Sequence, residues 1–514
     1  MKINNNLILV FACLLAVSCS LDYDPLGAYS DVTEGSSASE DKPIYVDRLA
    51  VLNARTSLMR RYRSGPEHWY DDWLLLGDVH SDNAYYGTYG NETIPFANNS
   101  IEGSNINLSR DWTQHMGNIA RANTFIEGVD QYRLSDITDA EKRQFKAEGK
   151  IFRAMVYFDM IRIWGRVPLI TTVAGEITSE TVVDIYPFYY PAQAEELEVY
   201  QQIEEDLIEG VQYALNNDPG DKTLLSKSVA RALLAKMYIQ EPLRNYDKVI
   251  QYANELEADG FVLTESLEDL FGVVLADPNQ PPGPDNLAID GLRNNVESIY
   301  EAQFMPGSAT WLAMMWGRIL DDWHANFTWA KWCTPTRNLI SEYNSEGVGK
   351  DKRYASTVVW YSCNWSIHYP SDNYAFMYKF RSNFSSMIKI RYADILLLKA
   401  EALIGKGDYA NAAAVVNLTR QRAGLDPLPA SASANKESIM NAYMKERRLE
   451  LALEGERWHD LVRWGLVEDV MNAAYTKDPD RIPLVYPYEQ YSYKLPIPAT
   501  AIDQNPNLVQ NPGY

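Results

Sequence analysis

Apolar positions recur at helical spacing through much of the first half of the chain. In residues 110–129, Trp112, Met116 and Phe125 lie close to a 3.6-residue repeat, which predicts an amphipathic helix. In residues 148–165 the side chains are apolar around most of the helical circumference. That pattern predicts a helix buried between others.

Two later segments, Ala230–Leu256 and Ala393–Gly424, share one pattern. Each has a helix rich in small residues, a short polar turn containing Asn-Tyr or Asp-Tyr, and a second helix. This pattern is typical of tetratricopeptide-type hairpins, which bury their apolar faces only by stacking on neighbours. The chain is therefore predicted to be mainly α, with a tetratricopeptide-repeat-like helical scaffold.

The residue composition and the predicted secondary structure change in the middle of the chain. Residues 276–286 read ADPNQPPGPDN, which is rich in turn formers, and short strand-like pieces such as VVWYS follow. We expect one body over residues 43–514, with the scaffold at about 43–260 and 385–475. A loop-rich, partly irregular insertion at about 261–384 interrupts the scaffold, and a proline-pinned tail, 476–514, wraps the surface.

The amino terminus has the layout of an export signal. Lys2 precedes an apolar run, Leu7–Val17, that is too short to span a bilayer, and small residues lead to Cys19. LLAVSC looks like a bacterial lipobox, although Ala16 stands where the leucine is usual. We expect a lipoprotein signal peptide at 1–18, lipidation of Cys19 and a flexible tether over 19–42. An ordinary cleaved signal with an incidental cysteine remains the alternative.

The net charge of the chain narrows the range of ligands that it is expected to bind. The formal net charge of -22 argues against binding nucleic acid or an acidic membrane surface, because both require local excess of positive charge. A neutral polymer or a peptide fits better. Beyond the signal, only Cys333 and Cys363 remain, and they either pair or stay as buried thiols.

Residues 310–333 contain five of the 13 tryptophans. They are Trp311, Trp316, Trp323, Trp329 and Trp332. Indoles usually bury their apolar bodies, yet flat aromatic rings also stack on the C–H faces of sugars. We predict that the first, third and fourth of these face outward and that the other two are packed.

Catalytic and metal motifs are lacking in the sequence. The six histidines show no HxH or HExxH spacing, and no GxSxG or Walker loop occurs. A surface glycosidase would need two opposed carboxylates, for which Asp321 with Asp322, or Asp78 with Asp82, are the available pairs. No cofactor is expected, although a structural calcium ion on the 276–286 loop would be compatible with its oxygen-rich composition.

The segment ERWHDLVRWG carries Arg457, Asp460 and Arg463 at helical spacing. A carboxylate between two guanidinium groups on one face predicts an ion-pair network that locks helices together. His459 lies beside it, but acid–base catalysis needs a second group that this motif does not supply.

An ordered series of motifs resembles the SusD/RagB family of outer-membrane lipoproteins. It consists of LGDVHSDNAYY, WTQHMGNIARANTFIE, AEGKIFRAMVYFDMIRIWGRVPLIT, NNVESIYEAQF, IRYADILLLKAEAL, ERRLELALEGERWHDLVRWG and the terminal NPNLVQNPGY. The resemblance covers nearly the whole chain in order. It departs from the family at Asn83, where an acidic residue is usual, and at His115 or Met116, where tyrosine is common.

The resemblance implies a cell-surface protein, lipid-anchored in the outer membrane, that caps a SusC-like TonB-dependent transporter and delivers a glycan to it without catalysis. RagB-like members handle peptides, which is the alternative, and a purely structural helical adaptor is a third possibility. We call LGDVHSDNAYY, residues 76–86, the Ser-Asp segment, and residues 310–333 the tryptophan segment. In the family, ligand-contacting aromatics come from the loops after the Ser-Asp segment and from the mid-chain insertion. The corresponding ligand-binding candidates are Tyr85, Tyr86, Tyr89, Trp311, Trp323, Trp329, Asn83 and Arg318.

Overall fold

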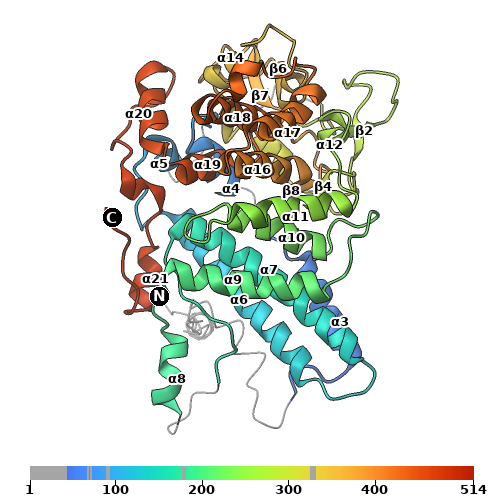
Figure 1. Cartoon of the computed structure of the whole chain (residues 1–514), viewed down its shortest axis with the longest axis vertical. Helices are drawn as coiled ribbons and strands as arrows, with labels where there is room; N and C mark the ends of the chain where they lie inside the picture. The colour runs from blue at the N-terminus through green and yellow to red at the C-terminus, as the bar shows by residue number, and fades with distance from the viewer. Residues whose placement is uncertain (1–42, 66–68, 70–71, 88–92, 176–180, 324–330) are drawn as a thin grey trace, which may run out of the picture.

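The computed structural model describes residues 43–65, 69, 72–87, 93–175, 181–323 and 331–514. The prediction of a mainly helical fold is confirmed (Figure 1). The predicted signal peptide, tether and Cys19 lie outside the described residues.

Long antiparallel helices form a continuous stack in which each contacts the next. Its members in spatial order are α6 (Ile106–Gln131), α7 (Asp139–Trp164), α9 (Glu196–Tyr213), α10 (Lys227–Tyr238), α11 (Tyr246–Ala258), α16 (Tyr392–Gly405), α17 (Tyr409–Arg422) and α18 (Lys436–Glu450). The two predicted hairpins are confirmed as α10 with α11 and α16 with α17. Figure 1 shows the stack rising from the cyan helices at the bottom to the orange helices above.

Local sequence signals explain the ends of α7. The Thr138 hydroxyl accepts a hydrogen bond from the backbone N–H of Glu141, and the Glu141 carboxylate accepts one from the backbone N–H of Thr138, so two orphan donors of the first turn are satisfied. The helix ends at Gly165, whose φ of 73° is costly for other residues. Its second half, Ile151–Trp164, is buried on every side, as the continuous apolar pattern predicts.

Further helices cover the flanks and ends of the stack. They are α3 (Arg48–Arg60), α4 (Asp72–Leu74), the π-helical turn η2 (Leu75–Val79), α5 (Ile94–Asn98), α8 (Val182–Tyr189), α12 (Glu268–Phe271), α13 (Leu312–Trp316), α14 (Arg337–Tyr343), α15 (Arg353–Thr357), α19 (Arg457–Trp464), α20 (Val467–Lys477), α21 (Ala499–Gln504) and the 3₁₀ turns η3 (Ala430–Ser433) and η4 (Gln490–Tyr493).

Strands in the described part of the chain form four separate two-stranded antiparallel ladders. The pairs are β1 (Ala84–Tyr86) with β5 (Cys333–Pro335), β2 (Val273–Leu275) with β3 (Ala288–Gly291), β4 (Ser298–Ala302) with β8 (Met387–Arg391), and β6 (Val358–Tyr361) with β7 (Tyr374–Met377).

The region between α11 and α16 is an insertion into the stack. It leaves after Ala258 and returns through β8 into Tyr392, and α16 then packs directly on α11. Two helices that are neighbours in space are therefore far apart in sequence, and the intervening chain carries β2 to β8 and α12 to α15. In Figure 1 the insertion appears in the upper part of the molecule, above α10 and at the height of α16, α17 and α18.

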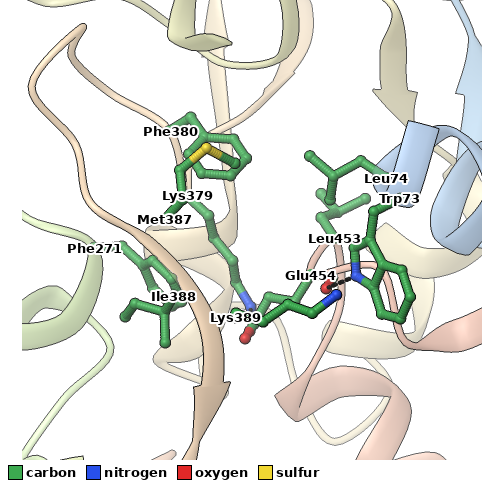
Figure 2. A pocket seen from close by; sticks show the side chains of 10 residues that line it. All are labelled: Trp73, Leu74, Phe271, Lys379, Phe380, Met387, Ile388, Lys389, Leu453 and Glu454. Atoms are coloured by element: carbon green, nitrogen blue, oxygen red, sulfur yellow. Dashed lines mark hydrogen bonds and ion pairs between the residues drawn. The ribbon is translucent and has the colours of Figure 1, made fainter. Parts of the chain in front are cut away.

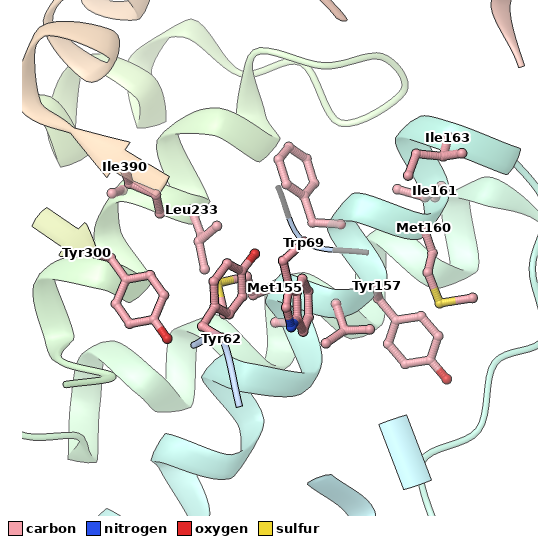
Figure 3. Packing of buried hydrophobic residues seen from close by; sticks show 14 of the residues in the cluster. Tyr62, Trp69, Met155, Tyr157, Met160, Ile161, Ile163, Leu233, Tyr300 and Ile390 are labelled. Carbon is pink, nitrogen blue, oxygen red and sulfur yellow. The ribbon is translucent and has the colours of Figure 1, made fainter. Parts of the chain in front are cut away.

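The main core fills the space between α3, α7, α10 and the β4–β8 ladder. Figure 3 shows Tyr62 stacked on Trp69, with ring centroids 4.1 Å apart and planes at 24°, and Tyr300 meeting Tyr62 edge-on at 5.3 Å. Burial of such rings supplies most of the free energy that holds these elements together.

The carboxyl-terminal tail returns across the first half of the molecule. The Leu495 N–H donates to the Ile163 carbonyl at 2.8 Å, and the Asn511 side-chain amide donates to the Trp164 carbonyl at 2.8 Å. The tail therefore satisfies the carbonyl groups that α7 leaves open at its end.

Candidate functional site

The β1–β5 ladder joins the two segments that supply most of the predicted ligand contacts. Tyr86 pairs with Cys333, and the Gly87 N–H donates to the Trp332 carbonyl at 2.7 Å. A Cβ at Gly87 would lie 1.3 Å from the Lys331 carbonyl oxygen, so only glycine allows this approach. The chain that leaves the Ser-Asp segment at Tyr86 and Gly87 therefore lies beside the end of the tryptophan segment at Trp332 and Cys333.

Arg318 lies between two aromatic rings. Its guanidinium carbon is 4.6 Å from the centroid of Trp323 and 4.6 Å from that of Tyr361, and the residue is 2% exposed. Trp323 and Tyr361 also meet edge-on at 5.4 Å. Burial lowers the pKa of Arg318 to about 10, so the group still carries its charge at neutral pH.

The backbone around Arg318 is held by the segment that precedes β8. The Arg318 N–H donates to the Phe380 carbonyl, and the Leu320 N–H donates to the Arg381 carbonyl at 2.7 Å. At Gly317 a Cβ would lie 1.8 Å from the Phe380 carbonyl oxygen. These contacts fix the path of the chain from α13 toward Trp323.

A second aromatic group lies at α13. Trp332 meets Trp311 edge-on at 5.6 Å and Trp316 edge-on at 5.8 Å, and the backbone N–H of Trp332 donates to the Met315 carbonyl at 3.0 Å. We define the aromatic site as Arg318 with the half-buried rings of Trp311, Trp323, Trp332 and Tyr361.

The predicted division of the tryptophans is partly corrected. Trp316 is fully buried, as predicted, but Trp311 and Trp332 are both half-buried against the main core, so they do not divide into one exposed and one packed ring. Trp323 is half-buried rather than exposed because Arg318 and Tyr361 cover part of it. Trp329 lies outside the described residues.

The prediction that Asn83 and Tyr85 face ligand is corrected by their burial. Asn83 is 0% exposed; its amide donates to Asp78 at 2.9 Å and its carbonyl oxygen accepts from Arg448 at 2.9 Å. Tyr85 is 2% exposed, stacks on His368 at 4.4 Å and donates its hydroxyl to Asp478. Both side chains are engaged in holding the protein together.

The remaining candidates of that segment differ. Tyr86 is half-buried, with its ring edge-on to His368 at 5.6 Å and its carbonyl 2.8 Å from His368 Nε2. Tyr89 lies outside the described residues. Tyr361 belongs to the aromatic site but was not among the predicted site residues, although the strand-like pattern around it was a usable signal.

The predicted ion-pair motif forms, with one partner exchanged. Asp460 binds Arg463 at 2.7 Å as expected, but its second guanidinium is Arg447, at 2.7 Å, instead of Arg457. Arg457 instead binds Asp82 at 2.7 Å. The motif therefore clamps α18, α19 and the Ser-Asp segment together.

Of the two carboxylate pairs suggested for a glycosidase, Asp78 with Asp82 serves structural contacts. Asp78 is 1% exposed and accepts hydrogen bonds from the backbone N–H groups of Leu453 and Gly455; burial raises its pKa to about 6 against these bonds. Burial also acts to raise the pKa of Asp82, but Arg448 and Arg457 hold it well below its usual range.

The two cysteines beyond the signal do not pair. Cys333 and Cys363 are buried thiols and form no disulfide.

In the loop expected to suit calcium, the Asn286 amide donates to the carbonyls of Asp277, Gln280 and Pro281, so the loop is closed by its own side chain. Within the described ranges, no cluster of three potential metal ligands occurs, and no helix has the length and apolarity to cross a membrane.

A small cavity is lined by residues that include Trp73, Phe271, Lys379, Lys389 and Glu454 (Figure 2). Its volume of about 20 Å³ is enough for about one water molecule and far too small for a sugar. The Lys389 ammonium lies 3.8 Å from the Trp73 ring centroid and binds Asp159 at 2.9 Å. This cavity belongs to the packed interior.

Solved structures share this architecture. Surface glycan-binding protein A from Bacteroides fluxus superposes with a TM-score of 0.71 at 19% identity, covering 91% of this chain and 100% of that one. Surface glycan-binding protein A from Bacteroides thetaiotaomicron, in complex with laminarihexaose, gives 0.68 at 19% identity, over 90% and 99% of the two chains. A laminarin-binding SusD-like protein gives 0.65 at 23% identity, over 91% and 98%. The fold is therefore of the SusD type.

Sequence comparison agrees over nearly the whole length. The family model of the SusD family matches residues 377–514, and a second, described as starch-binding associating with outer membrane, matches residues 29–239. SusD-like protein P38 from Formosa agariphila is 26% identical over 94% of this chain and 96% of its own length. The chain belongs to the SusD/RagB family.

Proposed function

We propose that this protein captures a neutral glycan at the aromatic site, on the cell surface, and delivers it to a SusC-like TonB-dependent transporter without catalysing a reaction. The observation that carries the proposal is the pair of half-buried rings, Trp323 and Tyr361, that flank a buried Arg318 in the insertion. Partly open aromatic faces suit the C–H faces of sugar rings.

Two further observations support it. Relatives with the same fold are named as glycan-binding or laminarin-binding proteins, and one matching family model describes starch-binding proteins associated with the outer membrane. The net charge of -22 suits a neutral polymer better than a polyanion.

The direct test is affinity electrophoresis and calorimetry against a panel of polysaccharides that includes starch and laminarin. With the best ligand, Trp323→Ala should weaken binding about tenfold, which corresponds to about 1.4 kcal/mol. Tyr186→Ala is the matched control, since Tyr186 is an aromatic residue of α8, 48% exposed and remote from the site.

The outcomes separate the alternatives. Binding to oligopeptides and to no polysaccharide would replace the proposal with RagB-like peptide capture. Release of reducing sugar, abolished by Asp321→Asn or Asp322→Asn, would establish a glycosidase. Equal binding by the Trp323 variant and wild type would move the glycan site away from the aromatic site.

Anchoring and delivery need a cellular readout. Cys19→Ser should move the protein from the outer-membrane fraction to the soluble fraction if Cys19 carries the lipid. Co-purification of a TonB-dependent transporter with the tagged wild-type protein, together with glycan uptake that depends on Trp323, would support delivery.

A further inference from the structure

A separate groove lies at the junction of α14, α18, α19 and α20. Its lining includes the apolar side chains of Met444, Leu449, Leu461, Trp464, Leu466 and Val470 and the charged side chains of Glu342, Lys445, Arg448 and Arg457. None of these residues belongs to the aromatic site, and all of them come from elements outside the tryptophan segment.

The size of the groove limits its occupant. Its volume is about 160 Å³, below the roughly 300–1,000 Å³ of pockets that enclose whole small-molecule ligands. It has room for one large apolar side chain. Five of its six apolar residues are aliphatic or thioether side chains, and Arg463 already lies over the ring of the sixth, Trp464, at 5.1 Å. Such a lining fits a hydrocarbon side chain better than a sugar ring.

The charges around the groove are unlike those of the whole protein. Lys445, Arg448 and Arg457 face one carboxylate, Glu342, in the lining. Asp82 lies behind them, 3.1 Å from Arg448 and 2.7 Å from Arg457, and is 5% exposed. Counting that carboxylate too, three positive and two negative charges leave an excess of one positive charge in a chain whose net charge is -22.

Lys445 is the accessible cation of the set. Its side chain is 37% exposed, donates to Ser345 at 2.7 Å and lies 3.4 Å from Glu342, a contact too long and too solvated to neutralise it fully. The two arginines are more deeply placed, with side chains 9% exposed. The groove thus has an apolar floor, and its lining carries more positive than negative charge, with Lys445 as the solvent-exposed cation beside Glu342.

We propose that this groove anchors a polypeptide partner through one large apolar side chain flanked by carboxylates. Protein interfaces concentrate their binding energy in such pockets, where an apolar anchor is buried and charged residues at the rim select the partner. The proposal does not depend on the glycan function, because the two sites share no residue.

The test uses three capped tetrapeptides with the purified full-length protein: acetyl-Asp-Leu-Phe-Asp-amide, its Asn-flanked analogue and its Lys-flanked analogue. Binding is measured by saturation-transfer NMR and titration. The acidic peptide should bind best and the basic one worst. Lys445→Glu should weaken the acidic peptide about three- to tenfold and strengthen the basic peptide.

Two further variants protect the result against misfolding. Glu342→Gln removes the rim carboxylate and should strengthen the acidic peptide, a gain that a damaged fold cannot produce. Val470→Trp should fill the groove and abolish binding of all three peptides. Lys436→Glu, an exposed change near the start of the same helix, α18, is the matched control and should change nothing.

Several results would overturn the proposal. The first is that no peptide binds the wild-type protein, and the second is that the acidic and basic peptides bind equally well. The third is that an oligosaccharide binds the wild-type protein in this groove and no longer binds the Val470→Trp variant. Polysaccharide binding at the aromatic site should be unchanged in all four variants, so failure here is distinguishable from failure of the proposed glycan function.

Discussion

Arg391 and Arg318 are equally buried, at 2% exposure, but the groups packed around them differ. Arg391 meets three carboxylates, Glu297 and Glu450 at 2.7 Å and Glu454 at 2.6 Å. Although burial alone lowers its pKa, these carboxylates hold the pKa well above its ordinary value. Arg318 lies between two rings, and its pKa falls to about 10.

The difference shows how one residue type serves two purposes. Arg391 belongs to a buried ion-pair network that also contains Arg353 and Arg422 and joins the end of the insertion to α17 and α18. Every partner there comes from the protein, so the network is closed. At Arg318 the rings that cover the cation are themselves half-buried, so part of their surface remains available to a ligand.

Removing Arg391 should have the largest effect. Arg391→Met removes the cation that binds Glu297, Glu450 and Glu454 together, although Arg422 still binds the first two and Lys379 the third. Because buried carboxylates then exceed their counter-charges, we expect the free energy of unfolding to fall by about 3–5 kcal/mol. Urea denaturation followed by far-UV circular dichroism measures it. A loss below about 1 kcal/mol would show that the network does not hold the helices together.

Lowering the pH should destabilise the protein through histidines buried among rings. His80 and His115 are each 1% exposed, and burial lowers both pKa values to about 4. Since the unfolded chain takes up these protons near pH 6.5, their contribution is full above that pH and is lost as the pH falls toward 4.

At pH 5 the expected cost is about 2 kcal/mol for each histidine. Burial raises the pKa of Asp78 to about 6, which acts in the opposite direction between about pH 6 and 4. Urea midpoints from pH 7.5 to 4.5 measure the sum, to which His368 and His459 contribute in the same direction as His80 and His115, because burial lowers their pKa values too. The double variant His80→Gln, His115→Gln should therefore make the curve shallower. An unchanged slope in that variant would contradict the assignment.

Removing Arg318 should have an intermediate effect on stability and a clear effect on binding. Arg318→Met removes the cation between the two rings and leaves the exposed carboxylate of Asp322, whose charge acts on Arg318, in water, so we expect a loss of about 2 kcal/mol, the scale of a desolvated cation–π contact. Glycan affinity should fall because Trp323 and Tyr361 lose the group that spaces them. Calorimetry on the folded variant checks this, and unchanged affinity would remove Arg318 from the site.

The smallest effect is expected at an exposed ion pair. Lys406 and Asp247 join α16 to the start of α11, but their side chains are 42% and 79% exposed. Lys406→Met should cost less than about 1 kcal/mol and should lose even that at high salt. Comparing the unfolding free energies of Lys406→Met and Arg391→Met shows how much burial contributes to an ion pair. An equal loss of unfolding free energy in both variants would contradict the stronger role given to the buried network.

Much of the scaffold was predictable because helical periodicity is a local property. The repeats around Trp112 and the continuous apolar run before Gly165 correspond to α6 and α7, and both predicted hairpins form. The partner of Arg457 was not predictable in the same way. Spacing on one helix suggests Asp460, yet Asp82, 375 positions away in sequence, is brought beside it by the fold.

The site was predicted by region better than by residue. The Ser-Asp segment and the tryptophan segment do meet, through the β1–β5 ladder. Asn83 and Tyr85 nevertheless turn inward, because β1 is enclosed by Asp78, Arg448 and His368. Trp316 and Trp323 are seven residues apart, a spacing that would suit one face of a helix, but α13 ends at Trp316, so the two rings do not share a helical face.

By itself, the sequence determined the helical scaffold, its tetratricopeptide-like hairpins and the family, since these rest on short-range periodicity and on ordered motifs. Only the tertiary structure decided which buried cations meet carboxylates and which meet aromatic rings, and how far each tryptophan is covered. The physical reason is that burial and ion pairing depend on groups supplied by distant segments. Arg391 and Arg318 have the same side chain. Their neighbours from distant segments make Arg391 part of a stabilising ion-pair network and Arg318 part of a candidate binding surface.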